Sequence, residues 1–370
     1  MKRIKVDIPF LISISILVIA GFLIFLSASL GILSNQNGKY SSVTFSQTFF
    51  GLFLGLIFCV MTSQIDYKLY KKYAFYLFIA SIIATLLVFV PKIGIEHGGA
   101  HRWISLGFSS FQTSELLKLG FIIYLSAWLS GVKDKVKTFS NGFLPFLILS
   151  VIIGVILLLQ PDTDTFFISI FAGVAVFLTA GGRWRYIFIL ALVGLIGLGA
   201  LAFTRPYVMS RINTFLNPAE DSLGKGYQIQ QSLIAIGSGG LTGRGFGQSI
   251  QKFDNHLPEP IGDSIFAVAS EEFGFVGSTL IIILFMFFTF RGLKIASQTQ
   301  DTFGRLMVVG IVIMVVSQAF VNISAMVGIM PLSGITLPFI SHGGTSLFMT
   351  LTEMGIILNI SKHKKITNRK

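Results

Sequence analysis

The chain has 370 residues, of which 53% are hydrophobic and 12% are charged, and its mean hydropathy is +0.79. This composition excludes an ordinary soluble domain and predicts an all-α polytopic membrane protein. The net charge of +12 is explained by basic loops at a membrane surface, so we expect no nucleic-acid partner. The single cysteine, Cys59, excludes an internal disulfide.

About ten segments reach or approach the ~20 apolar residues that a transmembrane helix needs. We treat residues 1–370 as one membrane domain. In chain order, the predicted spans cover residues 8–33, 44–63, 73–91, 113–131, 143–160, 164–181, 186–204, 264–290, 304–330 and 343–361.

Most of the 28 Lys and Arg residues fall in the two tails and in alternate connections between the spans. Because basic loops stay in the cytoplasm, this pattern predicts that both chain ends are cytoplasmic. The extracytoplasmic side carries the longest connection, residues 205–263, between the seventh and eighth spans. Its aromatic and aliphatic residues predict an ordered cap with a short helix near residues 227–236. The outer segment 95–114, with Trp103 and Phe108, is expected to lie in the membrane interface.

An unusual group of acids lies where the eighth span begins. Residues 257–277 read LPEPIGDSIFAVASEEFGFVG, although the whole chain has only 16 acidic residues; the acids are Glu259, Asp263, Glu271 and Glu272. Moving an ionised carboxylate into hydrocarbon is costly, so such groups usually face a wet cavity or a partner and mark function by default. Asp263 lies at the predicted helix mouth, where the positive helix end is expected to lower its pKa.

Two further groups of charges each have two explanations. Glu115 and Lys118 are three residues apart at the start of the fourth span and share a helix face. They either neutralise each other near the lipid headgroups or face an internal cavity. Asp162 and Asp164 follow Pro161 at an outer turn, where they either cap the next helix or contribute to a site.

The glycine-rich stretch GSGGLTGRGFG at 237–247 lacks the Lys-Ser/Thr ending of a nucleotide P-loop. Either its backbone amides, with Arg244 and Lys252, hold a pyrophosphate, or its glycines form a tight loop that needs positive φ. Scattered histidines on the outer side predict polar packing and form no recognisable metal motif; they are His97, His101, His256 and His342.

Together these stretches resemble the SEDS family, the FtsW/RodA/SpoVE group of bacterial cell-wall glycosyltransferases. The resemblance is carried by GFSSFQTSELLKL at 107–119, QPDTDT at 160–165, residues 226–277, and PLSGITLPFISHGGTSL at 331–347. It covers essentially the whole chain in order, and GQSIQK and ITLPF favour the FtsW division branch. The family's HTDFIF reads IGDSIF here, and its ISYGG reads ISHGG, so the acid is kept while its neighbours differ.

The resemblance implies a peptidoglycan glycosyltransferase that polymerises lipid II at the outer face of the bacterial cytoplasmic membrane. Asp263 matches the family's essential acid and is expected to be the general base that takes a proton from the attacking sugar hydroxyl. The leaving lipid pyrophosphate needs cations, and the resemblance also implies a divalent ion, Mg²⁺ or Mn²⁺. The residues expected to bind substrate are Arg102, Glu115, Lys118, Asp162, Arg244, Lys252 and Glu259.

Two other functions stay open at this point: a flippase or transporter for lipid II, and a non-catalytic division scaffold. The resemblance further implies a partner, a single-span class B penicillin-binding protein that cross-links the strands, and other division or elongation proteins. Small residues allow close contact between membrane helices. The ninth span and the turn after it are therefore the candidate docking face, unless these residues only pack the bundle: Ser317, Ala319, Ser324, Ala325 and Gly328.

Overall fold

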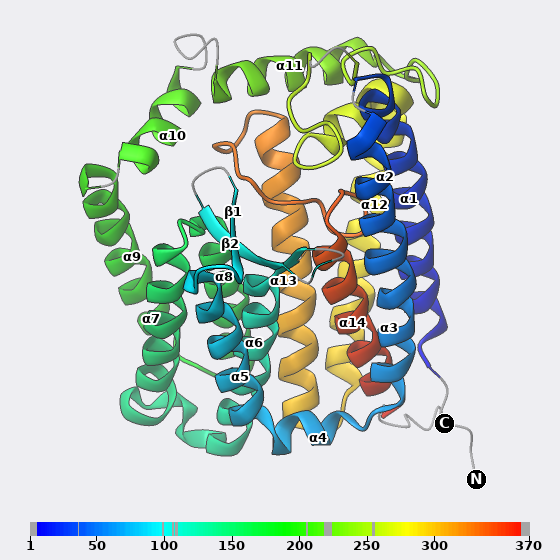
Figure 1. The fold of residues 1–370 in the computed structure, drawn as a ribbon. Helices are drawn as coiled ribbons and strands as arrows, with labels where there is room; N and C mark the ends of the chain where they lie inside the picture. Colours follow the sequence, from blue (N-terminus) through cyan, green and yellow to red (C-terminus); the bar gives the residue numbers. More distant parts are fainter. Residues whose placement is uncertain are drawn as a thin grey trace.

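The computed structural model is a bundle of helices that stand side by side, with their connections gathered at the two ends (Figure 1). Within the described residues, six helical stretches are long and apolar enough to cross a membrane, and three shorter apolar helices accompany them. The structure describes residues 6–35, 37–97, 100–105, 107, 110–204, 206–217, 224–253 and 256–363.

Each predicted span corresponds to a helix, which confirms the all-α polytopic membrane fold. In chain order the helices are α1 (Ile8–Asn35), the π-helical η1 (Ser46–Leu54) with α3 (Gly55–Gln64), α5 (Ala74–Leu86), α6 (Thr113–Val132), α7 (Leu144–Leu159), α8 (Thr163–Thr179), α9 (Trp184–Thr204), α12 (Ile265–Gln298), α13 (Thr302–Met326) and α14 (Gly344–Ser361). The last of these, α14, carries Glu353 and Asn359, yet it is almost wholly buried, against α3 and η1.

Helix α13 forms the centre of the bundle and packs against α6, α8 and α12. Ser317, Ala319, Ser324 and Ala325 on this helix are buried inside the protein. These four side chains pack the spans against one another, as the alternative explanation holds, whereas Gly328 in the turn after α13 is half-buried, so the docking face at residues 317–328 stays a prediction.

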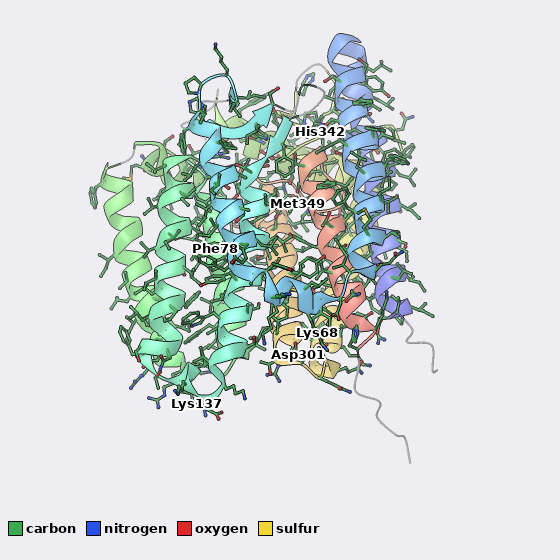
Figure 2. The ribbon with its side chains drawn as sticks, turned by 60° about the horizontal axis from the view of Figure 1, so that its bottom comes forward. Lys68, Phe78, Lys137, Asp301, His342 and Met349 are labelled. Atoms are coloured by element: carbon green, nitrogen blue, oxygen red, sulfur yellow. The ribbon has the colours of Figure 1, made fainter. Side chains whose placement is uncertain are left out.

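The two ends of the bundle differ in structure. One end, here called the loop side, carries α2 (Asn37–Phe45), a small sheet, α10 (Pro206–Leu216) and α11 (Lys225–Ser238). The other end, the α4 side, carries α4 (Tyr67–Lys72) and the short helix η3 (Lys133–Lys137). Figure 2 shows the two ends again, with His342 toward the loop side and Lys68 and Asp301 on the α4 side. Helix α11 confirms the short helix that was expected near residues 227–236.

The outer segment 95–114 has a regular structure that the sequence did not indicate. It forms an antiparallel sheet in the order β1 (Gly94–His97), β2 (Ala100–Ser105), β3 (Ser110–Gln112) and then enters α6. Trp103 pairs with Gln112 across β2 and β3 and is half-buried, whereas Phe108 lies outside the described residues. The sheet anchors Arg102 beside the turn that precedes α8.

Helix α9 lies at the edge of the bundle and continues into α10 (Figure 1). Phe188, Leu195 and Phe203 on this helix are 72%, 69% and 92% exposed. Large apolar side chains that point outward along a spanning helix suit contact with lipid chains. The path α9–α10–α11 therefore leads from the edge of the bundle across the loop side.

Candidate functional site

The eighth predicted span is broken close to its start. Gly274 in α12 has φ +65° and ψ −163°, so the helix is interrupted just after Glu271 and Glu272. The glycine-rich loop fills the break: the amides of Arg244 and Gly245 donate to the carbonyls of Glu271 and Glu272, at 3.0 and 2.9 Å. The backbone groups that the break leaves without helical partners are thereby satisfied.

Glycine is required where the loop and the broken helix meet. A Cβ at Gly274 would lie 2.3 Å from the amide nitrogen of Gly243, and a Cβ at Gly243 would lie 2.1 Å from the carbonyl oxygen of Glu272. Both residues also have positive φ. The tight-loop explanation thus accounts for these glycines, and the two amides that bond the helix carbonyls are not free to hold a pyrophosphate.

The carboxylate of Glu271 holds this loop in place. It is fully buried and accepts hydrogen bonds from Ser249 Oγ at 2.6 Å and from the amides of Ile250 and Gln251, both at 3.2 Å. Arg244 Nε lies 3.2 Å from its Oε1 atom. A carboxylate with this many donors has a structural role that needs no substrate.

The neighbouring carboxylate, Glu272, makes a second buried anchor. Lys252 Nζ donates to it at 2.7 Å, Ser27 Oγ on α1 donates at 2.6 Å, and neither the lysine nor the glutamate side chain is exposed. Removing one partner of a buried ion pair strongly destabilises a protein, because the other charge stays buried without compensation. Arg244 and Lys252 therefore have structural partners, and their predicted contacts with substrate stay predictions.

Asp263 lies in the loop before α12, on the loop side, and is half-buried. Its backbone carbonyl accepts a 2.9 Å hydrogen bond from Asn322 Nδ2 on α13, and the same nitrogen donates to the carbonyl of Ile335 at 2.7 Å. A Cβ built at Gly334 would lie 3.7 Å from Asp263 Oδ2. Asn322 thus joins the acid's backbone to the segment that covers it.

The covering segment, residues 331–343, follows α13 and packs against the loop that carries the acid. Ser341 Oγ donates to the carbonyl of Gly262 at 2.8 Å, and the amide of His342 donates to the carbonyl of Ile261 at 2.7 Å. Two sequence stretches that the resemblance singled out, 226–277 and 331–347, therefore meet at Asp263.

The pKa of Asp263 is raised from 3.8 to about 7, mainly because burial disfavours the charged carboxylate; the carboxylates of Glu259 and Asp164 add to this increase, and Arg211 and Arg102 partly oppose it. The expectation that the positive helix end would lower this pKa is wrong. The residue at the helix N-cap is Ser264, and desolvation of the Asp263 carboxylate is the largest effect.

Two arginines contribute positive charge near this acid. Arg211 on α10 forms an ion pair with Asp164 at 2.8 Å. Arg102 on β2 lies 3.8 Å from Asp162 and donates to the carbonyls of Gln160 and Pro161.

Asp162 also caps α8 by accepting from the amide of Thr165, which confirms its capping explanation. The sequence reasoning did not select Arg211, although it lies on a short amphipathic helix in the predicted outer cap.

The intramembrane pair Glu115–Lys118 faces the interior of the bundle. The two side chains are buried and 2.9 Å apart, which excludes the explanation that they lie at the headgroups. Lys118 Nζ also donates to Gln318 Oε1 at 2.9 Å, and Gln318 Nε2 donates to the carbonyl of Thr336 at 3.0 Å. A chain of hydrogen bonds therefore joins this pair to the segment that covers Asp263.

Gln318 and Asn322 were also missed by the sequence reasoning. They are four residues apart on α13, so they lie on one helix face, and both bond the 331–343 segment. Two amide side chains at this spacing inside an apolar span could have identified these residues as site candidates, because polar groups within spanning helices usually have partners or functions.

The described side chains do not form a preformed metal centre: no group of three or more His, Cys, Asp or Glu residues in that part of the chain is placed to hold an ion. Near Asp263, the carboxylate of Asp164 is already paired with Arg211. His342 stacks on Phe25, with ring centroids 5.9 Å apart, and burial lowers its pKa to about 4, as expected for a packing residue.

Comparison with known proteins gives a consistent result along the chain. A family model for cell cycle proteins of the FtsW/RodA/SpoVE type matches residues 8–366. Stage V sporulation protein E of Bacillus subtilis is 39% identical over 312 residues, which cover 84% of this chain and 85% of that protein. A protein of Geobacter sp. strain M18 named "Probable peptidoglycan glycosyltransferase FtsW" is 39% identical over 83% of this chain and 84% of its own length.

Solved structures agree with this result. The structure described as "Structural coordination of polymerization and crosslinking by a peptidoglycan synthase complex" matches with a TM-score of 0.79 and 26% identity, over 96% of this chain and 98% of that one. The rod shape determining protein RodA of Thermus thermophilus matches with a TM-score of 0.72 and 26% identity, over 98% of this chain and 99% of that one. The chain is thus a multi-pass membrane protein that belongs to the FtsW/RodA/SpoVE family.

Proposed function

We propose that this protein is a peptidoglycan glycosyltransferase that polymerises lipid II into glycan strands, in the division branch of its family. The observation that carries the proposal is Asp263 on the loop side, a half-buried carboxylate whose pKa is raised to about 7 and whose charge interacts with Arg102 and Arg211. Curated relatives are named for this activity, which supports the assignment.

The reaction needs a base and a stabilised leaving group. The hydroxyl of one sugar attacks the anomeric carbon of the other, the new glycosidic bond forms, and the bond to the lipid pyrophosphate breaks. Asp263 accepts the hydroxyl proton, and a pKa near the working pH suits a general base. Arg102 and Arg211 supply positive charge for the departing pyrophosphate.

A requirement for Mg²⁺ or Mn²⁺ stays a prediction, because the described residues do not form a metal centre, and no step above depends on one. Activity measured with a chelator and after re-addition of either ion tests it.

We further propose that the loop side faces outward from the bacterial cytoplasmic membrane and that both chain ends are cytoplasmic. The basic residues Lys68, Lys71, Lys133 and Lys137 on the α4 side support this orientation. A single-span class B penicillin-binding protein is the proposed partner, and the similarity to a peptidoglycan synthase complex supports it. Crosslinks from each spanning helix to that partner locate the contact.

The decisive experiment gives the purified protein lipid II in a bilayer and separates the products by size. Glycan polymer from the wild type, lost in Asp263→Asn and kept in Asp134→Asn, is the expected result. Asp134 is a matched control because it is an exposed carboxylate in η3, at the other end of the bundle. A flippase would move labelled lipid II across the bilayer without polymer, and a scaffold would do neither, with or without the partner.

A further inference from the structure

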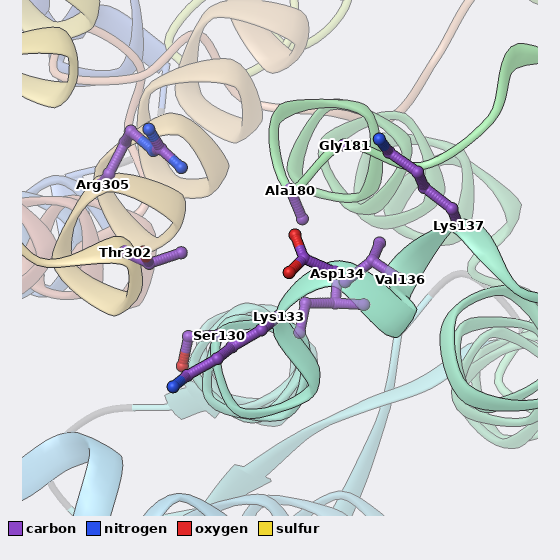
Figure 3. Close-up of a pocket in the computed structure, with 10 residues that line it drawn as sticks. Ser130, Lys133, Asp134, Val136, Lys137, Ala180, Gly181, Thr302 and Arg305 are labelled. Carbon is purple, nitrogen blue, oxygen red and sulfur yellow. The ribbon is translucent and has the colours of Figure 1, made fainter.

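A hollow on the α4 side is not explained by glycan synthesis. It has a volume of about 240 Å³ and lies where α6, η3 and the end of α8 meet the first turn of α13 (Figure 3). Figure 3 shows Thr302 and Arg305 on one wall, with Lys133, Asp134 and Lys137 on the turn opposite. The chemically active groups that line it are Ser130, Lys133, Asp134, Lys137, Thr302 and Arg305.

The charges in this hollow are unbalanced, with three cations against one carboxylate. None of the cations forms an ion pair with an acid in the described part of the chain. Arg305 Nε is buried and has no hydrogen-bond partner among the described residues. A buried guanidinium nitrogen without an acceptor is costly, so an acceptor from outside the chain would stabilise it.

The backbone holds these groups in a fixed arrangement. Lys133 ends α6 with φ +49° and ψ −125°, a conformation that a residue with a side chain rarely adopts. Thr138 caps the helical turn that follows by accepting from the amide of Asn141. Arg305 lies in the first turn of α13, which Asp301 caps. The cations therefore come from two helix ends that lie on opposite walls of the hollow.

We propose that this hollow binds a phosphate group, and specifically the phosphate of an anionic lipid headgroup. Arginine and lysine together with hydroxyl groups are the donors that phosphate oxygens take. Basic pockets between spanning helices, at the depth of the headgroups, are the usual place for such lipids. The hollow is also small, which suits one headgroup better than a protein segment.

The full-length protein in detergent tests this proposal by thermal unfolding. Three probes are added separately: micellar phosphatidylglycerol, micellar phosphatidylcholine and inorganic phosphate. The variant is Lys133→Gln/Arg305→Gln, and the matched control is Lys68→Gln/Lys294→Gln, which removes two exposed charges, one on α4 and one near the end of α12. Both variants are first checked for an unchanged elution profile without added lipid.

Phosphatidylglycerol should raise the unfolding temperature of the wild type and of the control. In the variant, the phosphatidylglycerol concentration that gives half of this increase should be about fivefold higher for each charge removed. Phosphatidylcholine should give a smaller increase. Phosphatidylglycerol alone identifies a lipid site, and an equal effect of inorganic phosphate identifies a site for free phosphate. Equal weakening of phosphatidylglycerol binding in the control and the variant would overturn the proposal.

Discussion

Asn322 offers the sharpest test of how the fold positions its acid. It is fully buried, and its Nδ2 atom donates to the carbonyls of Asp263 and Ile335 at 2.9 and 2.7 Å. Asn322→Ala removes both bonds and leaves two carbonyls with fewer donors, so we expect a loss of about 2–4 kcal/mol of stability. The side chain contacts the acid's backbone and not its carboxylate, so its role is to position Asp263.

The effect on polymerisation should exceed the effect on folding. Displacement of a catalytic group by about 1 Å can reduce the rate by about 10²-fold. We therefore expect Asn322→Ala to lower kcat about 10- to 100-fold, with KM changed little. The assay measures glycan polymer from lipid II with the folded fraction of the protein, isolated by size exclusion.

Asn359→Ala is a matched control on the α4 side. Asn359 is also buried, donates to the carbonyl of Ser63 at 2.9 Å and accepts from the amide of Tyr67 at 3.1 Å. The two variants should lose similar stability, and only Asn322→Ala should lose catalytic rate. Equal rates in the two folded variants would refute the positioning role, because the loss would then be structural only.

Three further predictions follow from the charged groups. Asp263→Asn should reduce polymer synthesis by at least ~10²–10⁴-fold while the protein still inserts into the membrane. Wild-type activity should rise as the pH passes about 7, because the Asp263 carboxyl then loses its proton. Between pH 3.8 and about 7 the folded chain holds this proton and the unfolded chain does not, so the wild type should lose stability relative to Asp263→Asn as the pH rises through that window. Lys118→Ala and Glu115→Ala should each impair synthesis more than stability, and a pair of fully active variants would contradict this. Glu271→Gln should expose the glycine-rich loop to proteolysis, whereas Glu259→Gln, at an exposed carboxylate, should not.

The spans were predictable from the sequence because each is a long apolar run that has no alternative to helix in a membrane. The break in α12 at Gly274 was not predictable, because it depends on Leu241 and Gly243 of the glycine-rich loop, which approach the helix only in the folded chain. Likewise, the strand residues Ala100–Ser105 carry no long alternating pattern, and their pairing depends on the turn into α6.

The site was predictable only where one residue carries the chemistry. Asp263 stands out as an acid at a helix mouth within a recognisable stretch. Arg211 and Asn322 become relevant only when α10 and α13 are placed beside that acid, since charge or polarity alone does not say which neighbour a side chain will meet.

The acids at the start of the eighth span had the same sequence signature, yet the structure divides them by the donors that surround each one. Glu271 and Glu272 are fully buried, but serine hydroxyls, amides and a paired cation surround each carboxylate, so each holds a loop in place. Among the residues that the structure describes, Asp263 receives no such set of donors, and burial and nearby carboxylates raise its pKa more than the arginines lower it. An acid that gains little from staying ionised is one that can take up a proton during a reaction, which is why the chemistry is assigned to Asp263 and not to the two glutamates.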